Sequence, residues 1–154
     1  MRILSAILVS TFCTNCKAAS KSESERIATD LSLRSSVKIA MKLPHPVEDK
    51  KMQVQIGGLT AQKPPEVLFA VSLRCRTRKI VYHLGYFNFF NATARLGREP
   101  SFTFDLPDIR HTTCPLSDFY LAIQPEGTIA TDSFPHVKYV DLLADGDLTS
   151  TPQD

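Results

Sequence analysis

The chain has 154 residues, of which 43% are hydrophobic and 22% charged, with four cysteines, six glycines and ten prolines. This length and composition suit one packed domain with polar ends, and they exclude a wholly disordered chain. The formal charge of +2 excludes the strong basic excess expected of a nucleic-acid-binding surface.

The first eighteen residues have the pattern of a secretory signal peptide. A positive start at Arg2 is followed by an apolar run that ends at Cys13 and is too short to span a bilayer. Small residues at Cys16 and Ala18 favour cleavage after Ala18. The alternatives are a buried N-terminal strand or helix, or a lipid anchor on Cys13 or Cys16. We therefore predict a signal peptide at residues 1–18 and a secreted protein, extracellular or periplasmic.

Cleavage at this point changes the charge and the cysteine count. It removes 18 of the 154 residues and two of the 18 basic side chains, which leaves a formally neutral chain. The remaining cysteines, Cys75 and Cys114, predict one disulfide in an oxidising compartment. A loop of this length would stabilise the fold by at most roughly 4 kcal/mol. The Cys13-x-x-Cys16 pair resembles a redox or metal motif, but it falls inside the predicted signal. No later segment has the roughly 20 apolar residues of a membrane span.

From residue 37 onward the chain alternates apolar and polar residues, which is typical of half-buried strands. Residues 19–35 are polar and predict a flexible lead-in, with a short helix around 23–28 as an option. Residues 144–154 predict a flexible tail. The predicted strands cover residues 37–43, 52–56, 67–73, 80–90, 101–106, 118–124 and 136–140. Gly57-Gly58 is expected to end the second strand, and Gly85 inside the fourth predicts a bulge or a close backbone approach.

Seven short strands separated by proline-rich and polar turns predict an all-β fold. We expect an antiparallel two-sheet β-sandwich over residues 36–143, with a closed barrel as the alternative. One face of each strand supplies the predicted core, which consists of Val37, Ile39, Met41, Val54, Ile56, Phe69, Val71, Leu73, Phe102, Phe104, Phe119, Leu121 and Ile123.

The order of strand and turn residues between positions 37 and 125 carries a resemblance to a known family. The positions concerned are Ile56, Gly58, Leu59, Phe69, Val71, Gly85, Phe87, Phe89, Phe102, Phe104, Asp105, Leu121, Ile123 and Pro125. In this order they resemble the C-terminal β-sandwich domain that follows the copper domain in many tyrosinases and polyphenol oxidases. The resemblance implies a non-catalytic domain that packs over a type 3 copper site, shielding it or assisting its maturation. The copper domain itself has no counterpart in residues 1–154, so the resemblance implies action on a partner in trans.

Copper catalysis within this chain is excluded by its histidines. A dinuclear copper centre needs about six, several at helical spacing. The chain has four, which are all isolated in the sequence: His45, His83, His111 and His136. Met41, His45 and Met52 suggest transient copper carriage, but a core methionine in alternation and a loop histidine are the preferred interpretation. We predict no catalytic residue, no metal ligand and no cofactor.

Two other patterns are interpreted as structural. Asp105 and Asp108 flank a proline and are expected to begin a turn rather than to form a carboxylate pair. Cys114 lies three residues after His111, but pairing with Cys75 is preferred to a nucleophilic cysteine. Asn91 begins an Asn-Ala-Thr glycosylation sequon, which functions only in a eukaryotic host.

The densest charge cluster is basic and consists of Arg74, Arg76, Arg78 and Lys79. At period two the three arginines would line one face of a strand. Such a face either discourages pairing between sheet edges or contacts an acidic or anionic partner.

The sequence thus predicts a secreted, non-catalytic β-sandwich accessory module that acts on a protein partner. Under the resemblance that partner is a type 3 copper oxidase. The alternatives are a small copper-carrying chaperone and an immunoglobulin-like adhesion or effector domain. We expect no nucleic acid and no membrane span.

Overall fold

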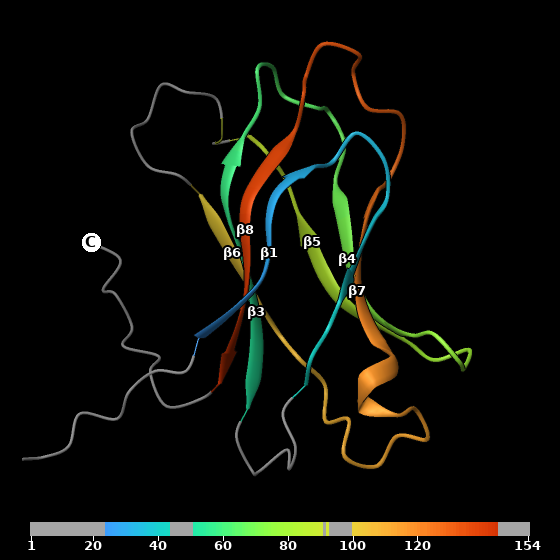
Figure 1. Cartoon of the computed structure of the whole chain (residues 1–154). Helices are drawn as coiled ribbons and strands as arrows, with labels where there is room; N and C mark the ends of the chain where they lie inside the picture. Colours follow the sequence, from blue (N-terminus) through green and yellow to red (C-terminus); the bar gives the residue numbers. More distant parts are fainter. Residues whose placement is uncertain (1–23, 44–50, 91, 93–99, 145–154) are drawn as a thin grey trace, which may run out of the picture.

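Two four-stranded antiparallel sheets face each other across a hydrophobic core (Figure 1). The computed structural model describes residues 24–43, 51–90, 92 and 100–144. The strands are β1 (Ser24–Ser32), β2 (Val37–Ala40), β3 (Met52–Thr60), β4 (Phe69–Cys75), β5 (Val81–Phe87), β6 (Ser101–Asp105), β7 (Phe119–Pro125) and β8 (His136–Ala144), with a 3-10 turn η1 (Leu116–Asp118) before β7. One sheet has the order β1-β8-β3-β6 and the other β2-β7-β4-β5. The predicted two-sheet antiparallel sandwich is confirmed.

The inward faces of both sheets build one core, as the alternation predicts. Val37 and Phe102 of the predicted core set are half-buried and packed against that core, and the other members are less than a tenth exposed. Phe69 in β4 is fully buried, and its ring lies 5.4 Å from the ring of Phe87 and 5.3 Å from that of Phe89. Aromatic rings at these separations pack favourably. Phe69, Phe87 and Phe89 thus form an aromatic cluster within the core, where β4 begins and β5 ends.

Strand β1 lies within the segment expected to be a polar lead-in. Its residues are exposed or half-buried, so the sequence lacks the apolar alternation of the other strands. It forms because it pairs with β8 along the edge of its sheet. Arg26 fixes this pairing: its guanidinium donates to Asp141 at 2.8 Å and lies 4.7 Å from the centre of the Tyr139 ring. The short helix expected around residues 23–28 is therefore wrong, and the sheet begins before residue 36.

Strand β3 continues through Gly57-Gly58 instead of ending there. Gly58 has a φ of 65°, which a glycine adopts without steric cost, and the strand resumes at Leu59 and Thr60. Gly57 is covered by the ring of Tyr139 on the neighbouring β8. The two glycines therefore carry the strand past a bulky neighbour rather than turning it.

Gly57→Ala is expected to lower the free energy of unfolding by about 1–3 kcal/mol, because the added methyl would overlap the Tyr139 ring and force it to move. Urea unfolding of the wild type and the variant measures this cost. In a Tyr139→Ala background the same substitution should cost much less, since the ring is gone. An equal cost in both backgrounds would contradict this explanation.

The bulge predicted at Gly85 is present. Val71 pairs with Gly85 but Ser72 pairs with His83, so Leu84 is the extra residue in β5. A Cβ at Gly85 would lie 3.0 Å from the Phe104 ring of the opposite sheet. The position thus combines a bulge with a close approach between the two sheets.

Strand β2 is the edge of its sheet and pairs with β7 alone. It has only four residues, and the chain continues past it as far as Leu43 within the described range. Near its end lie the β4–β5 connection and the segment from Leu106 to η1. In the part of the chain that the structure describes, no helix is long and apolar enough to cross a membrane.

Candidate functional site

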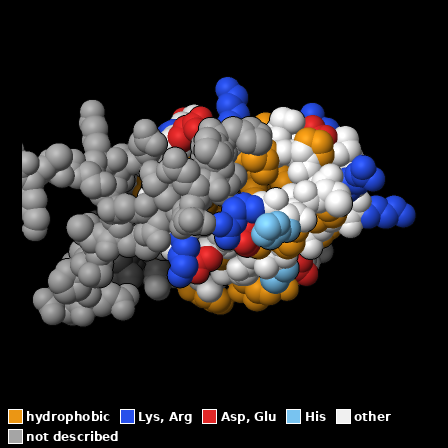
Figure 2. All heavy atoms as spheres, turned by 90° about the horizontal axis from the view of Figure 1, so that it is seen from below, with side chains coloured by type: hydrophobic (Ala, Val, Ile, Leu, Met, Phe, Trp, Pro, Cys, Tyr) orange, Lys and Arg blue, Asp and Glu red, His pale blue; other side chains and the backbone are white. Residues whose placement is uncertain are grey.

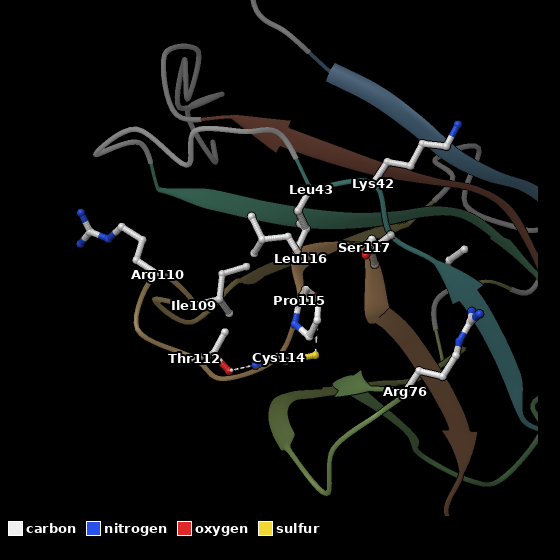
Figure 3. A pocket seen from close by; sticks show the side chains of 12 residues that line it. Lys42, Leu43, Arg76, Ile109, Arg110, Thr112, Cys114, Pro115, Leu116 and Ser117 are labelled. Carbon is white, nitrogen blue, oxygen red and sulfur yellow. Dashed lines mark hydrogen bonds between the residues drawn. The ribbon is translucent and has the colours of Figure 1, made fainter.

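A groove of about 940 Å³ lies at one end of the sandwich, between the end of β2 and the segment that joins β6 to β7 (Figure 3). Its apolar lining comes from Met41 and Leu43 on one side and from Ile109, Cys114, Pro115 and Leu116 on the other. A smaller hollow of about 320 Å³, lined by Lys38, Ala40, Arg76 and Tyr120, shares Ala40 and Arg76 with it. The two hollows therefore adjoin along β2, and we call them together the β2 groove.

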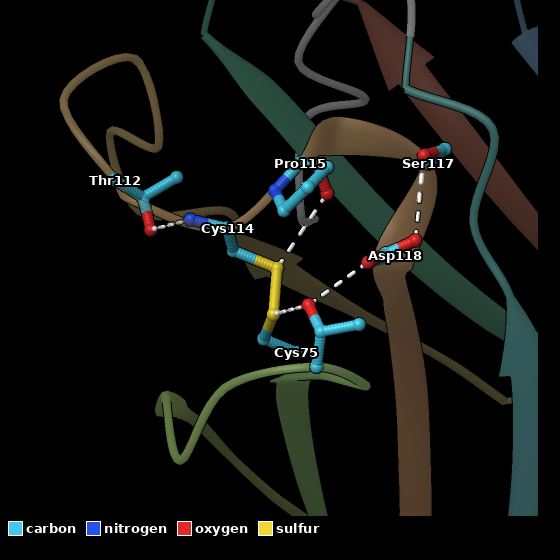
Figure 4. The surroundings of a disulfide bond; sticks show 7 residues. Cys75, Thr112, Cys114, Pro115, Ser117 and Asp118 are labelled. Carbon is cyan, nitrogen blue, oxygen red and sulfur yellow. Dashed lines mark hydrogen bonds between the residues drawn. A yellow bond between two sulfur atoms is a disulfide. The ribbon is translucent and has the colours of Figure 1, made fainter.

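The far wall of the β2 groove is held by the disulfide that the sequence predicts. Cys75 at the end of β4 is bonded to Cys114, at a sequence separation of 39 (Figure 4). Beside this bond the Thr77 hydroxyl donates to Asp118 at 2.9 Å. The backbone N–H of Arg76 donates to the Asp118 carbonyl at 2.9 Å. These links fasten the segment before β7 to the tip of the β4–β5 hairpin.

The opposite end of this segment is anchored in the core. Leu106 donates its N–H to the Met52 carbonyl at 2.8 Å, and the Ile109 side chain is only 3% exposed. Asp108 accepts from the Arg110 N–H at 3.0 Å, which starts the turn predicted at this position. The wall is thus fixed by the disulfide at one end and by apolar burial at the other.

The rim of the β2 groove is cationic. Lys42 and Arg76 are exposed, and among the described residues neither side chain has an ion pair or a side-chain hydrogen bond. The Lys38 ammonium lies 5.7 Å from the centre of the Tyr120 ring, on the outer face of the sheet. In Figure 3 the side chains of Lys42 and Arg76 lie at the margin, around the apolar centre. Unpaired cations at an exposed rim attract acidic groups.

Arg110 contributes less to this positive rim. It donates to both carboxylate oxygens of Asp108, at 2.9 and 2.7 Å. Hydrogen bonds from Arg110 hold the pKa of the Asp108 carboxyl well below its usual range. Asp108 therefore stays ionised at neutral pH and neutralises Arg110.

From below, Lys and Arg side chains stand out from the described part of the molecule, with apolar surface between them (Figure 2).

The backbone of β2 has hydrogen-bonding groups on the edge that faces away from β7. Met41 donates its N–H to the Phe119 carbonyl at 3.2 Å. In an antiparallel ladder the backbone N–H and C=O groups of Ile39 and Val37 therefore also point toward β7. The N–H and C=O groups of the intervening residues Lys38 and Ala40 consequently point away from the sheet. Among the described residues, no backbone group outside β7 bonds to them.

The proposed copper ligands do not meet at an exposed site. Met41 is 2% exposed and Met52 is 7% exposed, and both belong to the core. His45 lies outside the described residues. Within the described range, no three His, Cys, Asp or Glu side chains are grouped so as to hold a metal ion.

The basic cluster is split by the fold, so the three arginines do not line one face. Arg74 lies on the outer face of β4, where it donates to Ser72 at 2.9 Å and to Gln124 at 2.5 Å. Strand β4 ends at Cys75, which places Arg76 and Arg78 in the hairpin connection. Arg76 alone among the four lines the β2 groove.

The remaining candidates lie apart from the groove or outside the described residues. Asp105 accepts from Gln53 at 2.6 Å and Asp108 accepts from Arg110 at 3.0 Å, so the two carboxylates have separate partners. The ring of His83 lies 4.6 Å from that of Tyr86 on β5. The sequon residue Asn91 and the whole predicted signal, with Cys13 and Cys16, lie outside the described range.

Sequence reasoning missed the β2 groove itself. One signal for it was present: Lys38 and Lys42 alternate with the apolar residues of the first predicted strand. The far wall gave no such signal, because its position depends on a disulfide between distant residues. Comparison of the sequence with protein-family models and with curated proteins found no match.

Proposed function

We propose that this chain is a secreted, non-catalytic β-sandwich module that acts by binding a protein partner. The observation that carries the proposal is the β2 groove, where an apolar centre lies within a rim of cationic side chains. Protein interfaces combine an apolar centre with a polar or charged rim in this way.

The resemblance to the tyrosinase C-terminal domain supplies the candidate partner, a type 3 copper oxidase. The residues that carry it, such as Ile56, Phe69 and Leu121, are fully buried core positions. Such positions specify a sandwich and say little about its partner. The partner's identity therefore depends on the resemblance alone, whereas the binding role depends on the groove.

Co-expression tests the proposed partner. The full chain, directed to an export pathway, is produced together with a tyrosinase-like copper domain that lacks its own C-terminal domain. We expect the two to co-purify and the copper content or the diphenol oxidase activity of the copper domain to change at least twofold. An exported protein of similar size serves as the control. No co-purification and no change in copper content or activity would refute the copper oxidase as partner.

A further inference from the structure

We propose that two copies of this chain associate through the outer face of β4 and β5, packed face to face with their strands antiparallel. This inference goes beyond the proposed binding of a partner, because it concerns the edge of the sheet opposite to β2. Two features support it: exposed apolar side chains along β5, and opposite charges at the two ends of β4.

The cross-strand pairs show which side chains lie on this outer face. In β4 the core positions alternate with outward-facing residues, which are Ala70, Ser72 and Arg74. On β5 these residues pair with Tyr86, His83 and Val81 respectively, and paired side chains share a face of the sheet. The rings of His83 and Tyr86 lie 4.6 Å apart, as expected of neighbours on one face. Val81, His83 and Tyr86 therefore form an outward row, which we call the β5 stripe.

The β5 stripe and its continuation carry most of the exposed large hydrophobic side chains. Val81 is 57% exposed and Tyr86 is 51% exposed. Exposed Leu68 precedes β4 and exposed Phe90 follows β5, which places both at the same end of this face. Among the described residues only one other large hydrophobic side chain, Phe134, is exposed. Apolar patches of this kind on soluble proteins mark interaction surfaces.

The two ends of β4 carry opposite charges. At its beginning lie Glu66 and Glu126, and the N–H of Glu126 donates to the Leu68 carbonyl at 2.8 Å. At its end, the connection to β5 carries Arg78 and Lys79 (Figure 1). All four charged side chains are exposed, and among the described residues none of them has an ion pair. The basic cluster seen in the sequence thus has an acidic counterpart at the opposite end of the same strands.

This charge distribution determines how the two copies are arranged. When the faces meet with antiparallel strands, the acidic end of each copy lies against the basic β4–β5 connection of the other. A twofold axis produces both contacts at once. Arg74, near the basic end of β4, also lies toward the acidic end of the other copy. Parallel packing would bring like charges together, which opposes association.

The bulge in β5 favours packing of faces over pairing of edges. Leu84 is the extra residue, so the regular spacing of N–H and C=O groups along the free edge of β5 is interrupted. A bulge at an edge strand discourages the addition of another strand there. Face-to-face packing does not use this edge and is unaffected by the bulge.

Sedimentation equilibrium of the full chain, produced through an export pathway, tests the association over protein concentrations from micromolar to millimolar. We expect the mass to rise from that of one chain to that of two and no further, because a twofold contact is closed. Tyr86→Glu should raise the dissociation constant of the dimer about tenfold, since it places a charge within the β5 stripe.

The matched control is Phe134→Glu, which should change the dissociation constant less than twofold. Phe134 is also an exposed aromatic residue, but it lies in the segment before β8 of the other sheet. A wild type that stays monomeric at every concentration would overturn the proposal and leave the β5 stripe to a different partner. Equal effects of Tyr86→Glu and Phe134→Glu would also overturn it.

Charge reversal tests the antiparallel arrangement. One variant carries Glu66→Lys with Glu126→Lys, and the other carries Arg78→Glu with Lys79→Glu. Each variant alone should dimerise more weakly than the wild type, because both ends of its face then carry the same charge. An equal mixture of the two should recover the dimer, since the basic face of one variant meets the acidic face of the other. A mixture that dimerises no better than the separate variants would show that the antiparallel arrangement is wrong.

Discussion

Phe69→Ala is expected to lower the free energy of unfolding by about 3–5 kcal/mol. Phe69 is fully buried at the start of β4, and its ring packs against those of Phe87 and Phe89. Removing the ring deletes these contacts and leaves a cavity that strands from two facing sheets cannot readily close. Domains of this size are stable by only about 5–15 kcal/mol, so this single change removes a large share of the total.

Urea unfolding followed by circular dichroism measures the effect. The matched control is Leu68→Ala, because Leu68 adjoins Phe69 in the sequence but is 44% exposed. We expect the control to cost less than about 1 kcal/mol, in keeping with the small effects of surface substitutions. Similar losses for the two variants would show that the aromatic cluster does not contribute more to stability than an exposed side chain.

The core could be predicted from the sequence because strand alternation is a local signal. Val54 and Ile56 in β3, like Leu121 and Ile123 in β7, occupy every second position and are fully buried. A strand with one buried face needs no information from distant residues to show this pattern. The two sheets and most strand positions therefore followed directly from the sequence.

Strand β1 could not be predicted because its stabilising contacts are distant in sequence. Arg26 pairs with Asp141, 115 positions away, and β1 buries few side chains of its own. Gly57-Gly58 was misjudged for a related reason. A glycine pair is a common turn signal, and only the ring of Tyr139 on β8 explains why the strand needs glycine there.

The β2 groove depends on both kinds of information. Its near side follows from the alternation of Lys38 and Lys42 with apolar residues. Its far wall exists because a disulfide and the burial of Ile109 hold one segment opposite β2. The pairing of Cys75 with Cys114 was predictable, but the space that it encloses was not, since that space depends on the path of the chain between the cysteines.

Replacing both cysteines, Cys75→Ala with Cys114→Ala, is expected to lower the free energy of unfolding by about 2–4 kcal/mol. The bond closes a loop with a sequence separation of 39, so its loss restores considerable freedom to the unfolded chain. Both side chains are less than a tenth exposed, so alanine also leaves small voids in the core. Urea unfolding of the oxidised wild type and the double variant measures the difference.

The reduced wild type is the control for this prediction, because it lacks the bond but keeps both cysteine side chains. We expect the reduced wild type to be less stable than the oxidised wild type by a similar amount. If the double variant is as stable as the oxidised wild type, the bond between Cys75 and Cys114 does not stabilise the fold.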